Sequence, residues 1–371
     1  MNPTSPAVAP TAIAGGATAQ ATTTDLPPLM TGPSAWYGPQ LAASGRWLER
    51  LDDVAVAEIE AAVRPLAAGN ADIARIRRED FPLPTLAPRL ANWLDELLNG
   101  RGFVTLRGLP VTRWSMRESA IAFFGLGTHL GSARSQNASG HVLGHVTDLG
   151  LHSSDPKVRI YQTRERQTFH TDSCDVVGLL CLRPARRGGL SALASTCTIY
   201  NEMRARRPEL ARQMFQPVAT DRRGEVPQGC DPWFEIPVLN WHAGQLSGIY
   251  QRQYIESAQR FEGAPKLSAL HREALDLFDA LANDPAIHLM SAFEPGDVQF
   301  VHNHSLLHDR TAFEDWPDPG KRRHLLRLWL SPSQARELPP VFGQRYGSIR
   351  PGDRGGIMLP STQLQAPLEP V

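Results

Sequence analysis

Short apolar runs separated by glycine and proline fill the second half of this 371-residue chain. They are VVGLLCL at 176–182, LSALAS at 190–195, IPVL at 236–239, VQFV at 298–301 and LLRLWL at 325–330. Runs of this length between turn residues predict β-strands. Their spacing favours a β-sandwich or jelly roll over a sheet built from β-α-β units. One amphipathic stretch, 267–282, predicts a helix among them.

The N-terminal part of the chain instead predicts helices. Segment 52–67 has apolar residues at helical spacing after an acidic start, and 87–98 predicts a second helix that glycines end. Ser115 and Glu118 form a capping-box pattern that opens a third helix. Between them, FVTL at 103–106 predicts a short buried strand. We therefore expect an α+β chain with a mainly β core and flanking N-terminal helices.

Residues 1–35 are rich in Ala, Thr and Pro, with almost no charge before the first aromatic residues. Such a segment buries too little surface to offset its ordering entropy, so we expect a disordered tail rather than a signal peptide. The remainder, 36–371, is predicted to form a single domain. The sequence leaves open whether its N-terminal helices pack on the β core or on a second subunit in a homo-oligomer.

Composition limits the partners. The 38 Lys and Arg residues balance 38 Asp and Glu residues, so no net basic field favours nucleic acid or an anionic membrane. No apolar stretch is long enough to span a bilayer. The four cysteines are too few for a disulfide scaffold and none is spaced as C-x-x-C, which favours reduced thiols and a cytoplasmic protein. A small molecule is the expected partner.

One His-x-Asp triplet, His170-Thr171-Asp172, lies within QTFHTDSCD. In extended chain, residues two apart point the same way and can converge on one ion. His271 and Glu273 have the same spacing but lie in a predicted helix, where their side chains diverge. Alone, His170 would be interpreted as an ordinary buried histidine with a hydrogen bond.

Support comes from GDVQFVHNHSLLHDRTAFED, which runs from an apolar strand into His302, His304 and His308. Two histidines and one carboxylate form the ligand set that holds non-haem Fe(II) on one face. Only one of these three histidines would be needed as the distant ligand. The other two would be hydrogen-bond donors behind the site or surface residues.

Arg323 and Arg327 are four apart in KRRHLLRLWL and would share one face of a strand with Trp329. The opposite face carries Leu326, Leu328 and Leu330, as a core-facing side should. Guanidinium groups inside a barrel are costly unless anionic ligands meet them. The alternative is that both arginines face solvent.

Four blocks, in order, resemble the TauD/TfdA group of taurine-dioxygenase-like Fe(II)- and 2-oxoglutarate-dependent oxygenases. They are RGFVTLRGLP, FHTDSCD with RRGGLSALAS, GDVQFVHNHSLLHDRTAFED and RRHLLRLWL, and the resemblance covers about 102–332. It implies a double-stranded β-helix, the clavaminate synthase-like jelly roll, as the core of the domain.

The resemblance also implies roles for particular residues. The catalytic iron ligands would be His170, Asp172 and His308, the last because it lies in Leu-His-x-Arg. Arg323 and Ser191 would hold the distal carboxylate of 2-oxoglutarate, with Arg322 as the nearest rival because the segment after His308 is longer than in taurine dioxygenase. Arg327 would contact either 2-oxoglutarate or the substrate.

The implied reaction uses Fe(II), 2-oxoglutarate and O2, releases succinate and CO2, and oxidises an unactivated C–H bond. Hydroxylation is the default outcome, with desaturation and ring closure as variants. The alternatives are a zinc hydrolase on the same three ligands and a non-catalytic sensor that binds a small acid.

The substrate site is expected in two polar stretches, 131–166 and 221–240. The candidate substrate-binding residues are Asn137, Arg159 and Tyr161. An arginine there would favour a small anionic substrate. The alternative is that Arg159 pairs with a nearby carboxylate or faces solvent.

Overall fold

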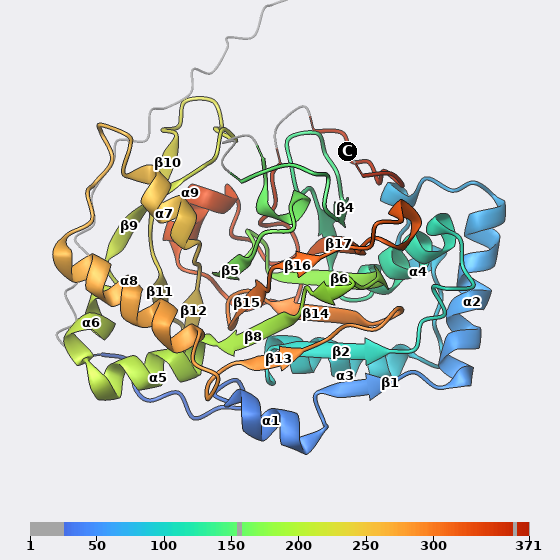
Figure 1. Cartoon of the computed structure of the whole chain (residues 1–371), viewed down its shortest axis with the longest axis horizontal. Coiled ribbons are helices and arrows are strands. Elements are labelled where there is room, and N and C mark those ends of the chain that lie inside the picture. The colour runs from blue at the N-terminus through green and yellow to red at the C-terminus, as the bar shows by residue number, and fades with distance from the viewer. Residues whose placement is uncertain (1–25, 154–157, 359–361, 371) are drawn as a thin grey trace, which may run out of the picture.

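Two antiparallel β-sheets form the centre of the computed structural model, which describes residues 26–153, 158–358 and 362–370 (Figure 1). The larger sheet has the strand order β1-β2-β14-β6-β17-β3, with β4 also paired to β17; only β1 and β2 are parallel. Its strands are β1 Leu48–Arg50, β2 Phe103–Arg107, β3 Ser132–Arg134, β4 Leu143–Val146, β6 Val176–Arg183, β14 Val298–His302 and β17 His324–Ser331.

The smaller sheet has the order β13-β8-β15-β5. Its strands are β5 Gln167–His170, β8 Ser191–Ser195, β13 Leu289–Ser291 and β15 Leu306–Arg310. Three two-stranded ribbons complete the described β structure: β7 Arg187–Gly188 with β16 Phe313–Glu314, β9 Pro217–Asp221 with β10 Trp233–Pro237, and β11 Leu239–His242 with β12 Gln245–Gly248.

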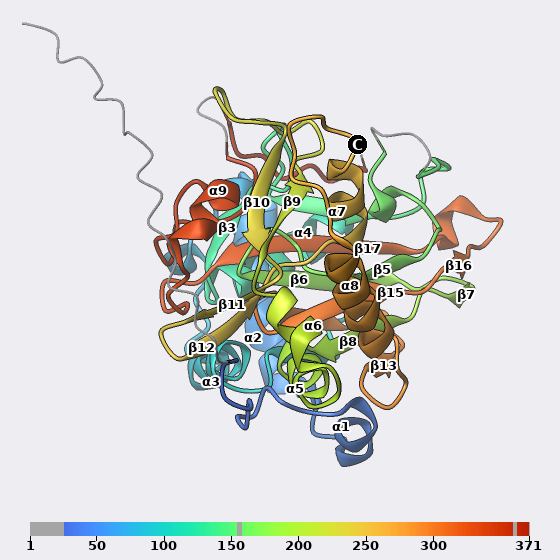
Figure 2. The ribbon, with the colours of Figure 1, turned by 90° about the vertical axis from the view of Figure 1, so that its left-hand side faces the viewer.

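The helices fall into two groups on opposite sides of the molecule (Figures 1 and 2). Helices α2 Asp53–Ala68, α3 Ala87–Leu98 and α4 Met116–Thr128 bury Ile59, Leu97 and Phe123 against the larger sheet. Helices α5 Thr196–Arg206, α6 Pro208–Gln213 and α8 Ala269–Ala282 bury Tyr200 and Phe278 against the smaller sheet. The remaining described α-helices are the short α1 Gly38–Ser44, α7 Arg252–Ala258 and α9 Gly343–Tyr346. Each sheet thus has its own apolar cover.

Most expected elements are confirmed. The helices predicted over 52–67 and 87–98 are α2 and α3, and the Ser115–Glu118 capping box opens α4 with both of its hydrogen bonds. The helix expected from 267 begins at Ala269, behind the cap residue Ser268. The apolar runs form β6, β8, β14 and β17, while IPVL is divided between β10 and β11.

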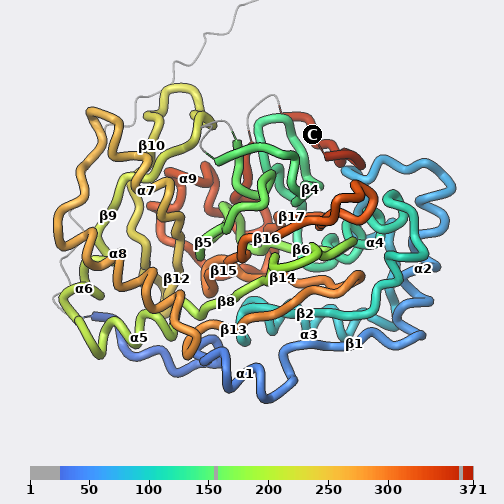
Figure 3. The backbone as a smooth tube through the Cα atoms, in the orientation of Figure 1, coloured from blue at the N-terminus to red at the C-terminus, as the bar shows by residue number. Residues whose placement is uncertain are grey.

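Three expectations were incomplete. The second half contains α5, α6, α7 and α9 besides α8, and the stretches 131–166 and 221–240 include strands. Of the tail expected over 1–35, residues 1–25 lie outside the described residues. Residues 26–35 instead run beside α5, where Tyr200 donates to the Pro27 carbonyl and Met30 exchanges hydrogen bonds with Asn201 (Figure 3). Within the described ranges, no helix combines the length and apolar character needed to cross a bilayer.

Candidate metal centre and its cavity

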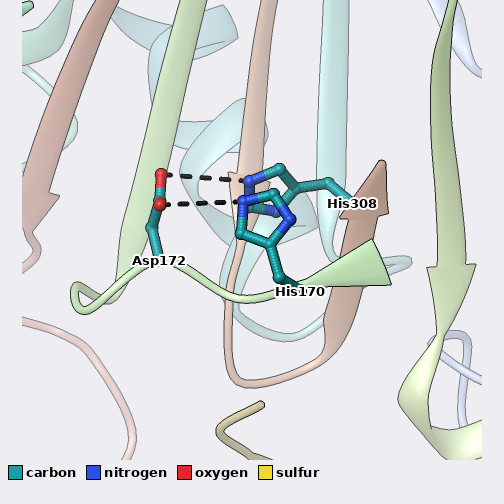
Figure 4. Close-up of side chains that lie close together, drawn as sticks. All are labelled: His170, Asp172 and His308. Atoms are coloured by element: carbon teal, nitrogen blue, oxygen red, sulfur yellow. Dashed lines mark ion pairs between the residues drawn. The ribbon is translucent and has the colours of Figure 1, made fainter. Parts of the chain in front are cut away.

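Strand pairing brings two of the predicted metal ligands together. His308 on β15 is the direct partner of His170 at the end of β5, so both side chains lie on one face of the smaller sheet. Their ring centroids are 4.1 Å apart. Asp172 lies in the turn after β5 rather than in extended strand, and its carboxylate points back toward both imidazoles (Figure 4).

The three side chains form a compact donor group. His170 Nε2 lies 3.9 Å from Asp172 Oδ1, and His308 Nε2 lies 3.9 Å from Asp172 Oδ2. One donor atom from each residue lies within 4.8 Å of the others, and all three side chains are at least 87% buried. Two imidazole nitrogens and one carboxylate oxygen at this separation can hold a single metal ion.

Hydrogen bonds fix how these ligands present themselves. His170 Nδ1 donates to the Thr168 carbonyl at 2.8 Å, which leaves the Nε2 lone pair directed at the group. Asp172 Oδ2 accepts from Trp329 Nε1 at 2.9 Å. The backbone N–H of Asp172 donates to Asn303 at 3.0 Å. The carboxylate is therefore held from both its side chain and its main chain.

The charge states also suit metal binding. Burial lowers the pKa of His308 to about 3, with the neighbouring His170 acting in the same direction, and burial lowers the pKa of His170 as well. Burial alone would raise the pKa of the Asp172 carboxyl, but Arg327, the two histidines and Trp329 outweigh it and hold the pKa below its ordinary value. At neutral pH the group is two neutral imidazoles and one carboxylate.

One cavity residue went unnoticed in the sequence. The Gln167 amide nitrogen lies 2.7 Å from His170 Nε2, the nitrogen that faces the carboxylate. A metal ion bound to His170 would have to displace this hydrogen bond. Nothing in the sequence distinguishes Gln167 from other polar residues before the triplet.

Both sheets contribute to the cavity around this group. Its wall includes Ser191 from β8, Gln299 from β14 and Arg327 from β17, together with Arg323 just before β17. We call His170, Asp172, His308, Arg323 and Arg327 the cavity cluster. The arginine face of β17 therefore points inward, while Leu326, Leu328 and Leu330 pack in the core on its other side.

Arg323 is a buried cation with an unused donor. It is 4% exposed, and its Nη1 has no hydrogen-bond partner among the described residues. Burial lowers its pKa to about 10, so the guanidinium remains charged at neutral pH. Its side chain lies over the Phe313 ring at 5.1 Å. Arg322, the rival for the same role, is exposed.

Ser191 and Arg327 have different surroundings. The Ser191 hydroxyl donates to Gln299 Oε1 at 3.3 Å. Arg327 Nε donates to Gln136 at 2.7 Å, and its Nη1 lies 3.6 Å from Asp172 Oδ2. Arg327 is therefore partly occupied in orienting the carboxylate.

The three candidate substrate residues are separated. Tyr161 lines the cavity, with the Arg327 guanidinium 4.5 Å from its ring centroid. Among the described residues of the cavity wall, neither Asn137 nor Arg159 is present. Asn137 Oδ1 accepts hydrogen bonds within its own turn. Arg159 pairs with Glu225 at 2.8 Å, the carboxylate pairing weighed as the alternative.

His302 and His304 lie away from the cavity wall but are not surface residues. Both are at most 1% exposed. His304 Nε2 lies 2.9 Å from Asp175 Oδ1, and His302 Nδ1 lies 2.9 Å from the Ser305 hydroxyl. Their hydrogen bonds belong to buried structure outside the cavity wall.

Arg310 is a second buried cation of the cavity wall. It donates to the carbonyls of Thr163 and Glu165, and its Nε lacks a partner among the described residues. Burial, then the neighbouring Arg323, lowers its pKa to about 9. It belongs to the Leu-His-x-Arg pattern, the one signal that could have drawn attention to it.

Comparison with known proteins gives concordant matches. The family described as taurine catabolism dioxygenase TauD, TfdA family matches residues 62–329. FR-33289 synthase of Streptomyces rubellomurinus (strain ATCC 31215) is 33% identical over 325 residues, covering 86% of this chain and 95% of the relative. The taurine hydroxylase-like protein SAT17 of Stachybotrys chartarum (strain CBS 109288 / IBT 7711) is 30% identical over 322 residues, covering 82% and 81%.

A solved structure extends the comparison to the fold. Asparagine oxygenase in complex with Fe(II), 2S,3S-3-hydroxyasparagine and succinate superimposes with a TM-score of 0.61 at 19% identity. The match covers 77% of this chain and 93% of that one. At this level of identity, the similarity shows a shared fold.

Proposed function

This chain belongs to the TauD, TfdA family of dioxygenases, and from that premise we propose how its cavity residues divide the work. The protein is an enzyme, an oxygenase that depends on Fe(II), 2-oxoglutarate and O2. Family membership therefore favours the oxygenase over the zinc hydrolase and the sensor. The residue roles and the substrate class below are our proposal.

The donor group fits iron. His170 Nε2, His308 Nε2 and a carboxylate oxygen of Asp172 within 4.8 Å are the observation that carries the proposal. This ligand set leaves positions open for other ligands. Burial and the low pKa values of both histidines keep the nitrogens unprotonated for a cation. We assign all three residues as metal ligands.

The cavity also fits a dicarboxylate. Arg323 Nη1 is buried in the cavity wall without a partner among the described residues, and a carboxylate would satisfy it with a charge-assisted bond. We assign Arg323 to the distal carboxylate of 2-oxoglutarate, with the Ser191 hydroxyl as a second donor. Arg327, already close to Asp172, orients the metal-ligating carboxylate.

When bound, iron and 2-oxoglutarate supply oxidative decarboxylation by O2, with succinate and CO2 released and a C–H bond of the substrate oxidised. The chain holds the ligands in place: Thr168 orients His170, while Trp329 and Asn303 orient Asp172. Apolar walls from Val177, Leu179 and other side chains limit access of water.

We propose a small anionic substrate, with hydroxylation as the reaction. Three guanidinium groups line the cavity, from Arg310, Arg323 and Arg327, against the carboxylates of Asp172 and Asp309. Asp309 is already paired with Arg166 at 2.7 Å. After Asp172 is subtracted, the three guanidinium groups carry two positive charges, which 2-oxoglutarate can balance. The two charges of a bound Fe(II) are then the surplus that favours an anionic substrate. A taurine hydroxylase-like protein and an asparagine oxygenase among the similar proteins support a small acid.

The sheet arrangement supports a finer description of the fold. We propose that the two sheets, which share one cavity, are the walls of a double-stranded β-helix, and that 36–371 form a single domain. We also propose the cytoplasm as the location, since the four cysteines are free.

Anaerobic addition of Fe(II) and 2-oxoglutarate tests the assignment of the ligands. We expect a visible metal-to-ligand charge-transfer band that is lost in His170→Ala and retained in His271→Ala, a histidine on α8. A folded wild-type protein without this band would contradict the proposed site.

The substrate class needs a separate screen. We expect small acids to stimulate succinate release, and the corresponding amides of the same acids to be much weaker. Stimulation by neutral compounds alone would contradict the anionic class.

A further inference from the structure

The turn that carries Asp172 is held on one side by Asn303 and on the other by residues beyond the matched family region, which ends at 329. On the inner side, Asn303 accepts from the Asp172 N–H, and its amide donates to the Cys174 carbonyl at 3.1 Å. On the outer side, the Gly356 N–H donates to the Ser173 carbonyl at 2.7 Å. The C-terminal segment therefore binds the main chain one residue from the ligand.

Asp175 closes the same turn and is completely buried. Its carboxylate accepts from His304 Nε2 at 2.9 Å and from the Ser331 hydroxyl at 3.1 Å. Arg354 Nε lies 2.9 and 3.0 Å from its two oxygens. We call Asp175, His304, Ser331 and Arg354 the support cluster.

Arg354 is itself completely buried, and each of its three side-chain nitrogens has a hydrogen-bond partner. Its Nη1 donates to the Ile349 carbonyl at 3.1 Å and its Nη2 to the Arg336 carbonyl at 2.8 Å. A buried cation is tolerated only when it is paired and hydrogen-bonded in this way. Arg354 thus joins two parts of the C-terminal segment to the ligand turn.

The glycines after Arg354 permit this close approach. Gly355 and Gly356 have φ of +72° and +76°, where side chains are disfavoured. A Cβ at Gly355 would lie 2.9 Å from the Ser173 carbonyl oxygen, and one at Gly356 would lie 2.8 Å from the Ser135 carbonyl oxygen. The sequence Arg354-Gly355-Gly356 is thus shaped to lie against the turn.

We infer that Arg354 is a positioning residue for the metal centre, acting on Asp172 through Asp175 and the turn that joins them. This inference rests on the proposed function. Metal affinity depends on ligand atoms being held close to their bound positions, and partners behind the ligands supply that constraint. Arg354 is absent from the described residues of the cavity wall, so it would act through the turn rather than by contact.

A second buried ion pair provides a matched control. Arg107 donates from Nε and Nη2 to Asp297 at 2.8 and 2.7 Å, and the Asp297 side chain is completely buried. Asp297 precedes β14, at the opposite end of that strand from His302. Loss of either arginine leaves a buried carboxylate without its counter-charge, but only Arg354 pairs with the ligand turn.

The test is anaerobic titration of the full-length chain with Fe(II) in the presence of 2-oxoglutarate, with the charge-transfer band and the Tm measured for every variant. We expect Arg354→Met to weaken Fe(II) binding by about 10- to 100-fold and to shift the band. Arg354→Lys keeps the positive charge but loses the planar guanidinium group with its several N–H donors. We expect it to lose less affinity for Fe(II) than Arg354→Met does. Arg107→Met should have a lower Tm than the wild type but the same affinity for Fe(II).

The outcomes separate the two proposals. A wild-type chain that binds no Fe(II) would overturn the proposed function and this inference with it. A wild-type chain that binds Fe(II), with Arg354→Met equal to it or no weaker than Arg107→Met, would overturn the inference alone. If Arg354→Met does not fold, Arg354→Lys decides: wild-type affinity and an unshifted band would overturn the inference.

Discussion

The turn between β5 and β6 contributes one carboxylate to each of two buried polar clusters, and the clusters differ in how their donors are used. In the cavity cluster, Arg323 Nη1 lacks a partner among the described residues. In the support cluster, the three side-chain nitrogens of Arg354 and the His304 Nε2 all have partners. The unsatisfied donor of Arg323 lies in the cavity wall and suits a carboxylate ligand, whereas the satisfied donors of the support cluster suit a structural role.

Two matched substitutions in the one turn should give the largest difference. Asp172→Asn removes the charged ligand, so we expect 2-oxoglutarate-dependent succinate release to be abolished with only a small loss of stability. Asp175→Asn leaves Arg354 buried without its counter-charge, and we expect a loss of about 3–5 kcal/mol in the free energy of unfolding. Succinate assays and urea denaturation of metal-free protein measure the two effects. If the two variants lost succinate release and stability to the same extent, the proposed difference between the two clusters would be contradicted.

The next effect concerns the unused donor of the cavity cluster. Arg323→Ala removes a charge-assisted contact with 2-oxoglutarate, and we expect its KM to rise by about 10- to 100-fold. Arg323→Lys should recover part of this loss. Arg322→Ala, a change at the exposed neighbour, is the control and should leave KM unchanged. A larger effect at Arg322 than at Arg323 would reverse the assignment.

The buried pair formed by His145 and His324 makes the stability of the folded chain depend on pH. His145 Nδ1 and His324 Nε2 are 2.7 Å apart, and burial, then the neighbouring His145, lowers the pKa of His324 to about 3. Between this pKa and the ordinary value of 6.5, the unfolded chain binds more protons at this site than the folded chain. Stability therefore falls as the pH falls through this window.

A substitution at His324 isolates the contribution of this side chain to the pH dependence of stability. We expect His324 to account for a loss of about 2 kcal/mol between pH 7.5 and pH 5 in the metal-free protein. His324→Gln should show a shallower pH dependence of unfolding in urea than the wild type. Parallel curves for the two proteins would show that the His324 side chain does not titrate in this way.

The smallest effect is expected at Ser191. A single neutral hydrogen bond contributes about 0.5–1.5 kcal/mol, so Ser191→Ala should raise the KM for 2-oxoglutarate by only about 2- to 10-fold. Ser191→Thr keeps the hydroxyl and should remain near the wild-type KM. A Ser191→Ala effect as large as that of Arg323→Ala would show that the serine, not the arginine, is the main contact.

The sequence predicted the parts of this molecule that depend on local pattern. The helix periodicity of α2 and the capping box of α4 depend on neighbouring residues. The strand pattern of β17 left open whether its arginine face points inward, and only the family resemblance implied that it does. Helix α5 was missed because its β-branched and polar residues, TCTIYNEMRAR, lack a clear apolar face and its burial comes from tertiary contacts.

Long-range contacts explain what the sequence could not provide. Arg159 was a reasonable cavity candidate until the fold brought Glu225, 66 residues away, beside it. Arg354 was not considered because its partner Asp175 is 179 residues away and no local pattern marks either residue. Gln167 was equally unmarked, since only the pairing of β5 with β15 gives its neighbourhood chemical meaning.

The most direct measurement of the central claim is anomalous diffraction at the iron edge, from crystals grown anaerobically with Fe(II) and 2-oxoglutarate. We expect one iron peak within bonding distance of His170 Nε2, His308 Nε2 and a carboxylate oxygen of Asp172, with the distal carboxylate of 2-oxoglutarate against Arg323. An iron peak elsewhere, or one bound by His302 or His304, would contradict the account.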